Sequence, residues 1–202
     1  MLTTACIDTA HWCRQLGRGV GVWINLSGRS LADQRLPATL AHALEQSQLD
    51  PGLLTLEITE GALMQNAAAT VRTLTLLREL GVHLAVDDFG TGYSSLAYLQ
   101  QFPVHALKVD RSFVAQLDRP TPEAEASAAI IRAIVNLAVG LDLQTVAEGI
   151  ETPDQLAAVT DLGCDLGQGF ILGRPAPPDA IALAAPSGVV LPAAFNNVAA
   201  GL

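Results

Sequence analysis

Two adjacent carboxylates, Asp87 and Asp88, directly follow the short apolar run Leu84-Ala85-Val86. A continuous apolar run predicts a strand buried on both faces, so the placement of two acidic side chains at its end requires an explanation. At about 4 Å and an effective dielectric constant near 20, two like charges repel by roughly 4 kcal/mol. The pair must therefore share a proton, face open water or hold a cation. A solvated turn, with Asp88 capping a following helix, is the simpler alternative.

A loop rich in glycine and hydroxyl groups, Phe89 to Ser95, follows the two acids. Gly90-x-Gly92-x-x-Ser95 alone is a weak signal for a phosphate-binding loop, and the glycines more readily explain a tight bend beside the acids. Asp88-Phe89-Gly90 also matches a protein-kinase motif. No kinase glycine loop or catalytic loop precedes it, so we reject that interpretation.

Strands and helices are expected to alternate along the chain, which is typical of a parallel sheet with helical crossovers. We predict strands at 20–26, 53–58, 82–87, 106–110, 144–148 and 164–170, and helices at 2–16, 36–48, 67–80, 94–100, from the loop at 120–122 to about 140, and at 153–162. Pro175, Pro177 and Pro178 are expected to introduce a final short helix. The carboxyl ends of these strands carry Asn25, Glu57, Asp87 with Asp88, Lys108, Glu148 and Gln168.

Polar residues at the end of every predicted strand favour a barrel whose active site lies at its C-terminal face. An open doubly wound sheet would concentrate its site at one switch point instead. A TIM-type (β/α) barrel has eight strands and we count six, so the predicted α/β fold is a barrel lacking two strands at its amino end. We expect one domain over residues 1–185 and a loosely ordered tail over 186–202.

The chain is acidic, with a net charge of -9 over 202 residues. This charge argues against binding DNA or RNA through a basic patch, and it means that an anionic substrate would need bound cations. The three cysteines are an odd number, which favours a reducing compartment, and Cys6, His11 and Cys13 fit no zinc pattern. The amino terminus lacks the features of a signal peptide, and the most apolar helix, at 128–141, is too short and polar to span a bilayer. We therefore expect a cytoplasmic protein without direct membrane insertion.

Six ordered motifs in this sequence resemble the EAL domain, the cyclic-di-GMP phosphodiesterase family of bacterial signalling. The resemblance covers residues 1 to about 177, and its spacing is that of the family. The motifs are Asn25-Leu26-Ser27, Glu57-Ile58-Thr59-Glu60, Asp87-Asp88-Phe89-Gly90-Thr91-Gly92-Tyr93-Ser94-Ser95-Leu96, Lys108-Val109-Asp110-Arg111-Ser112-Phe113, Ala147-Glu148-Gly149-Ile150-Glu151-Thr152 and Gln168-Gly169-Phe170. The Glu-Ala-Leu tripeptide that names the family is absent, and so are its strand and the arginine that follows it.

The resemblance implies a role for each residue of a metal-dependent site. It makes Asn25, Glu57 and Asp87 ligands of one Mg²⁺ or Mn²⁺ ion and gives a second ion to Asp87 with Asp88. It assigns Lys108 and Glu148 to the attacking water. It makes Glu60, with Thr91 and Glu151, a brace for the loop at 89–95, and it places Gln168 in the substrate site. Read without the resemblance, Lys108 could be a surface lysine on an edge strand, and Glu148 could contact the dipole of the next helix.

The function that the resemblance implies is hydrolysis of cyclic-di-GMP to linear pGpG. The alternative is an inactive EAL-like module that binds cyclic-di-GMP or a partner protein; a barrel metal enzyme of the enolate type is more remote. We expect this chain alone to be weakly active, because a family glutamate ligand is missing. Expected partners are the cyclic dinucleotide, a second copy in a homodimer, or upstream sensory and GGDEF domains.

Overall fold

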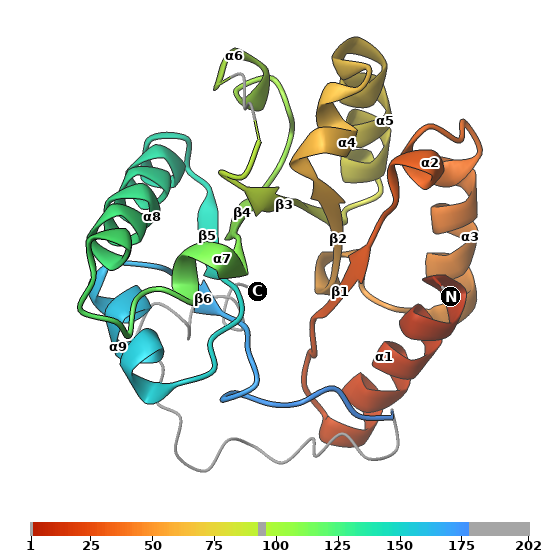
Figure 1. Cartoon of the computed structure of the whole chain (residues 1–202). Helices are drawn as coiled ribbons and strands as arrows, with labels where there is room; N and C mark the ends of the chain where they lie inside the picture. Colours follow the sequence, from red (N-terminus) through yellow and green to blue (C-terminus); the bar gives the residue numbers. More distant parts are fainter. Residues whose placement is uncertain (1, 93–95, 178–202) are drawn as a thin grey trace.

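Six parallel strands form one sheet in the computed structural model, which describes residues 2–92 and 96–177. The strands follow one another in the sheet in chain order. Figure 1 shows the sheet at the centre with the longer helices around its outer side. The curled sheet confirms the predicted six-stranded part of an α/β barrel.

The strands are β1 (Val22–Asn25), β2 (Leu54–Thr59), β3 (His83–Phe89), β4 (Ala106–Val109), β5 (Gln144–Ala147) and β6 (Leu166–Gly167). The longer helices are α1 (Leu2–Leu16), α3 (Leu36–Ser47), α5 (Ala67–Glu79), α8 (Pro122–Gly140) and α9 (Pro153–Asp161). The short helical turns are α2 (Gly28–Leu31), η1 (Pro51–Leu53), α4 (Glu60–Met64), α6 (Leu96–Leu99) and α7 (Arg111–Val114).

Alternation along the strands separates the core from the site. On β2, Leu54, Leu56 and Ile58 pack into the main hydrophobic core. The residues between them point to the opposite, inner face of the curled sheet, and Glu57 is one of these. The main core therefore lies between sheet and helices, whereas the inner face is free to carry polar side chains.

A β-bulge interrupts β3 where the two acids lie. Val86 pairs with Leu107 and Phe89 pairs with Val109, so Asp87 and Asp88 together face the single residue between those partners. Asp88 has a positive φ of 55°, a conformation that aspartate tolerates better than most residues do. Val86 and Phe89 both pack in the main core, although they are three positions apart in the strand, an odd number. The extra residue thus resets the alternation of the strand.

The sixth strand is much shorter than the predicted 164–170, because the chain turns around Ile150 after Gly167. The Ile150 N–H donates to the Gln168 carbonyl at 3.0 Å, and the Ile150 carbonyl accepts from the Ile171 N–H at 3.2 Å. A side chain on Gly169 would place its Cβ 2.0 Å from the Ile150 oxygen. Only glycine allows this backbone approach, which ends the strand.

Short helical turns at the strand ends are the other difference from the prediction. Three of them, α2, α4 and α7, start at Ser27, Thr59 and Asp110, whose side chains each accept a hydrogen bond from a backbone N–H of the turn. Thr152 and Gln155 form a capping box at the start of α9, which confirms the helix predicted from residue 153. Residues 94 and 95 of the predicted helix at 94–100, the helix after Pro178 and the tail at 186–202 lie outside the described residues. In the part of the chain that is described, no helix is long and apolar enough to cross a membrane.

Candidate active site

The side chain of Lys108 is the centre of a buried charge cluster on the inner face of the sheet. Its Nζ lies 2.6 Å from Glu57 Oε1 and 3.1 Å from Asp87 Oδ1, and it also contacts Glu148 Oε1. Lys108, Glu57 and Asp87 are buried, and Glu148 is partly buried. Lys108 is therefore no surface lysine.

Neighbouring strands bring these four side chains together. Glu57 lies on β2, Asp87 on β3 and Lys108 on β4, and Glu148 directly follows β5, where its N–H continues the ladder by donating to the Val109 carbonyl at 3.2 Å. Parallel strands end at the same edge of a sheet, so residues from four strands meet although the sequence separates them widely.

The cluster contains more negative than positive charge. Burial by itself would lower the pKa of Lys108, but hydrogen bonds to Glu148 and Glu57 outweigh it and raise the pKa, so the ammonium group stays charged. Burial raises the pKa of Glu148, aided by the charges of Asp87 and Glu57 and opposed by the hydrogen bond from Lys108. One ammonium faces three carboxylates, and this imbalance favours binding of a further cation.

Asp88 extends the negative cluster. Asp87, Asp88 and Glu148 each offer a carboxylate oxygen, and the three oxygens lie within 4.8 Å of one another. Burial raises the pKa of Asp88, and the charges of Asp87 and Asp110 add to the effect. Hard oxygen donors at this spacing fit a divalent cation such as Mg²⁺ or Mn²⁺.

The other two predicted metal ligands, Glu57 and Asn25, lie outside this group of three converging carboxylates. Glu57 contacts Lys108 and does not belong to the group of converging oxygens. Asn25 pairs in register with Glu57 at the end of β1, and its side chain is exposed. Both residues thus lie at the same edge of the sheet as the acids.

Asp110 belongs to this cluster, but the sequence analysis gave it no role. Its charge helps to raise the pKa of Asp88, and its carboxyl group accepts from the Ser112 N–H at 2.9 Å. Burial would raise the pKa of Asp110, but hydrogen bonds from Ser112 outweigh it and lower the pKa. The sequence signal for Asp110 is its position two residues after Lys108, because residues two apart on a strand point to the same face and Asp110 lies at the same edge of the sheet.

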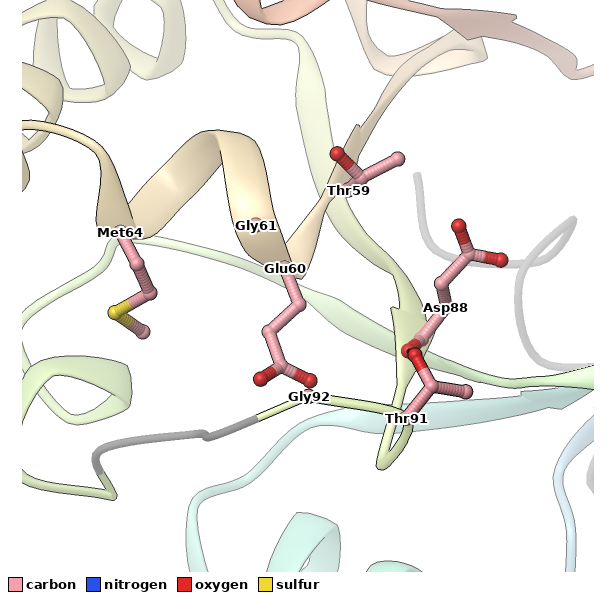
Figure 2. Close-up of a pocket in the computed structure, with 7 residues that line it drawn as sticks. All are labelled: Thr59, Glu60, Gly61, Met64, Asp88, Thr91 and Gly92. Carbon is pink, nitrogen blue, oxygen red and sulfur yellow. The ribbon is translucent and has the colours of Figure 1, made fainter.

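Glu60 contacts the loop that follows the acids. The Gly90 N–H donates to Glu60 Oε2 at 3.3 Å, and the Thr91 hydroxyl donates to the Asp88 carbonyl at 2.9 Å. A Cβ on Gly92 would lie 2.8 Å from Glu60 Oε1, so any other residue here would force the Glu60 carboxylate to shift. Figure 2 shows the Glu60 side chain reaching this segment of the loop. A cavity of about 480 Å³ lies here, lined by Thr59, Glu60, Gly61, Met64, Asp88, Thr91 and Gly92.

Two predicted residues lie away from these contacts. Glu151 precedes α9 with an exposed side chain, and its N–H donates to Gln155 Oε1 at 2.8 Å. Gln168 is exposed just after β6, where its N–H donates to the Ala147 carbonyl at 2.8 Å. Among the side-chain hydrogen bonds and ion pairs of the described residues, none joins Glu151 to Glu60 or Gln168 to Lys108.

Comparisons with a family profile and with known proteins agree on one family. The EAL domain profile matches residues 1–175. The chain is 48% identical over 177 residues to the cyclic di-GMP phosphodiesterase NbdA of Pseudomonas aeruginosa, covering 88% of this chain and 22% of that protein. It is 42% identical over 180 residues to the bifunctional diguanylate cyclase/cyclic di-GMP phosphodiesterase MucR of the same organism, covering 88% of this chain and 25% of MucR.

Solved structures show the same fold. The PaMucR phosphodiesterase in complex with c-di-GMP superposes with a TM-score of 0.83 at 40% identity, covering 88% of this chain and 70% of that one. The EAL domain of Mycobacterium smegmatis DcpA gives a TM-score of 0.79 at 39% identity, covering 88% and 78%. The chain spans about a quarter of the length of NbdA and of MucR.

Proposed function

This chain belongs to the EAL domain family, and on that premise we propose that it hydrolyses cyclic-di-GMP to linear pGpG with the help of divalent cations. One observation carries the proposal. A buried ammonium, that of Lys108, touches carboxylates from three neighbouring strands, with Asp88 alongside. Burying charged groups is costly, and a buried charge left without a partner costs on the order of 3–5 kcal/mol. Because the carboxylates outnumber the ammonium, bound cations would offset this cost.

The substrate class follows from the relatives and from charge. NbdA is named a cyclic di-GMP phosphodiesterase, and PaMucR was solved with c-di-GMP. A cyclic dinucleotide carries two phosphodiester charges, which an acidic cluster without cations would repel. Cations held by the carboxylates reverse that repulsion, so the proposed substrate and the proposed ions require each other.

We propose that the carboxylates hold two ions, Mg²⁺ or Mn²⁺. Asn25, Glu57 and Asp87 would hold one, and Asp87 with Asp88 would hold the other. When bound, such ions lower the pKa of a water molecule and offset charge on the phosphate. Glu148 contacts Lys108, and one of its carboxylate oxygens lies within 4.8 Å of oxygens of Asp87 and Asp88.

The chain's own residues then have distinct tasks in the hydrolysis. Glu148 accepts a proton from the attacking water, for which its raised pKa suits it. Lys108 holds Glu148 and Asp87 in place and offsets charge that develops on the phosphate oxygens. The water oxygen forms a bond to phosphorus, the bond from phosphorus to a ribose 3′-oxygen breaks, and that oxygen takes up a proton. Glu60 and Thr91, with Glu151, keep the loop beside the acids, and Gln168 borders the substrate.

The test is to incubate the full-length gene product with cyclic-di-GMP and Mg²⁺ or Mn²⁺ and to follow pGpG by chromatography. We expect cleavage that chelation with EDTA abolishes and that Asp87→Asn lowers at least about 100-fold, since it removes a carboxylate from the reacting centre. Asp161→Asn, an equal change at an exposed position in α9, is the matched control. Tight binding of cyclic-di-GMP without cleavage would contradict the enzyme and favour the inactive module.

A further inference from the structure

His105 joins the amino ends of two strands through both its backbone and its side chain. Its N–H donates to the Leu84 carbonyl at 2.8 Å, and its ring Nδ1 accepts from the Leu84 N–H at 3.1 Å. Its carbonyl accepts from the Gln144 N–H at 2.9 Å. One residue thus satisfies both backbone groups of Leu84 and also connects to β5.

This connection sets the register of the two strands that carry the acids and the lysine. Above His105, β3 and β4 pair in regular register only at Ala85 with Ala106 and at Val86 with Leu107. The bulge then shifts the ladder where Asp87 faces Lys108. With so short a regular ladder, the link at His105 makes up a large share of what fixes β4 against β3.

We propose that His105 is a positioning residue, a clamp whose neutral imidazole fixes β3 against β4 and so holds Asp87 and Lys108 at their working separation. It acts through the strands and touches no proposed reacting group. The effect on catalysis rests on the proposed function, but the clamp itself does not.

The clamp requires one protonation state of the ring. Nδ1 can accept from the Leu84 N–H only while it carries a lone pair, so the proton of the neutral ring lies on Nε2. An imidazolium has two donors, and it would set a donor against the Leu84 N–H. Protonation therefore releases the side-chain half of the clamp.

The surroundings of the ring keep it neutral. The His83 ring lies against it, with centroids 4.7 Å apart and a 52° tilt. Burial lowers the pKa of His105 to about 4, and the charges of His83 and Arg78 add to this. The cleft of about 1350 Å³ that both rings border also has charged groups in its wall, namely Arg18, Arg78, Asp50 and Asp142.

A metal site at the histidine pair fits the geometry less well. Nδ1 of His105 is already used as an acceptor, and Nε2 then carries the proton, so neither nitrogen offers a lone pair. Within residues 2–92 and 96–177, the converging group of possible metal ligands is Asp87, Asp88 and Glu148, and it includes neither His83 nor His105. His105 therefore acts as a clamp and not as a ligand.

Hydrogen exchange of the Leu84 amide measures the clamp directly. At pH 7 we expect His105→Leu to lower the protection factor of this amide by about tenfold, the size of effect expected when one buried hydrogen bond is lost. His105→Asn, which keeps an acceptor oxygen near Nδ1, should restore much of the protection. His42→Asn is the matched control, because His42 is exposed on α3.

Acid gives the second arm. In the wild type, protection at Leu84 should fall as the pH drops from 6 toward 4, after correction for the intrinsic exchange rate, and His105→Asn should remove that fall. Unchanged Leu84 protection in His105→Leu, or the same acid response in His105→Asn, would overturn the clamp.

The functional arm uses cleavage of cyclic-di-GMP by the full-length protein at pH 7. We expect His105→Leu to lower kcat more than it raises KM, and His105→Asn to recover most of the loss. If exchange responds as described but no variant or wild type cleaves the substrate, the clamp stands and the proposed function fails. If cleavage is normal in His105→Leu while Leu84 loses protection, the positioning role is wrong.

Discussion

Lys108 Nζ lies 2.6 Å from Glu57 Oε1, and the two side chains are 3% and 5% exposed. A pair this deeply buried costs much desolvation, and its worth depends on every partner remaining in place. Here Asp87 and Glu148 share the same ammonium. Removing that ammonium leaves three carboxylates with no positive neighbour among the described residues.

Lys108→Ala should therefore impair catalysis and stability together. In the full-length protein we expect kcat to fall at least about 100-fold with little change in KM, because the ammonium acts on the attacking water and the developing charge. Steady-state kinetics at several substrate concentrations measures both constants. A raised KM with unchanged kcat would move Lys108 to substrate binding.

The same variant should be destabilised in a way that divalent cations partly correct. Without cations we expect the free energy of unfolding in urea to fall by about 3 kcal/mol, as for other broken buried ion pairs. Saturating Mn²⁺ should restore more stability to Lys108→Ala than to the wild type, because the cation replaces the lost positive charge. Equal stabilisation of both proteins by Mn²⁺ would argue against binding at these carboxylates.

Asp88→Asn tests the charge imbalance through pH. Burial and the neighbouring acids raise the pKa of Asp88, so the folded state binds its proton more readily than the unfolded state does. Stability linked to this group is then present at low pH and is lost as the pH rises through the folded pKa. In EDTA we expect Asp88→Asn to be more stable than the wild type at pH 7, with the difference vanishing near pH 3. A variant that is less stable than the wild type at pH 7 would contradict this prediction. Asparagine is the suitable replacement because it also tolerates the positive φ of this position.

Gly92→Ala tests the closeness of Glu60 to the loop. The new Cβ would meet Glu60 Oε1 at 2.8 Å, and we expect a loss of about 1–2 kcal/mol in unfolding free energy. In a Glu60→Ala background the same change should cost much less, since its steric partner is gone. Additive losses in the double-mutant cycle would show that Gly92 and Glu60 do not interact.

How far the sequence could predict this site depends on the kind of residue. Strand ends are strong signals, because an apolar run that stops at Glu57, Asp87 or Glu148 predicts both the strand and the edge on which the acid lies. The fold followed from the alternation of strands and helices, and the differences were the short helical turns at the strand ends and the extent of β6. That strand ends early because Gly169 packs against the Ile150 backbone, a contact between segments that no local pattern contains.

Contacts among the site residues were less accessible. Sequence spacing indicated that Asp87 and Lys108 lie at one edge, but it could not show that Lys108 contacts Glu57 and Asp87 at once. Asp110 was missed because its pattern also fits an ordinary helix cap, which it forms with Ser112. Its contact with Asp88 depends on the bulge in the neighbouring strand.

The bulge in β3 also limits which changes of length this region can accept. Deleting Asp88 would remove the bulge and leave Phe89 opposite Val109 on the core side, so the strand would become regular but would lose one carboxylate and shorten the path to the loop by one residue. An insertion between Val86 and Asp87 would instead turn the acids and Phe89 to the opposite faces. Substitutions here alter one group at a time, whereas an insertion reverses a whole strand end. Changes of length within β3 should therefore be tolerated less well than substitutions.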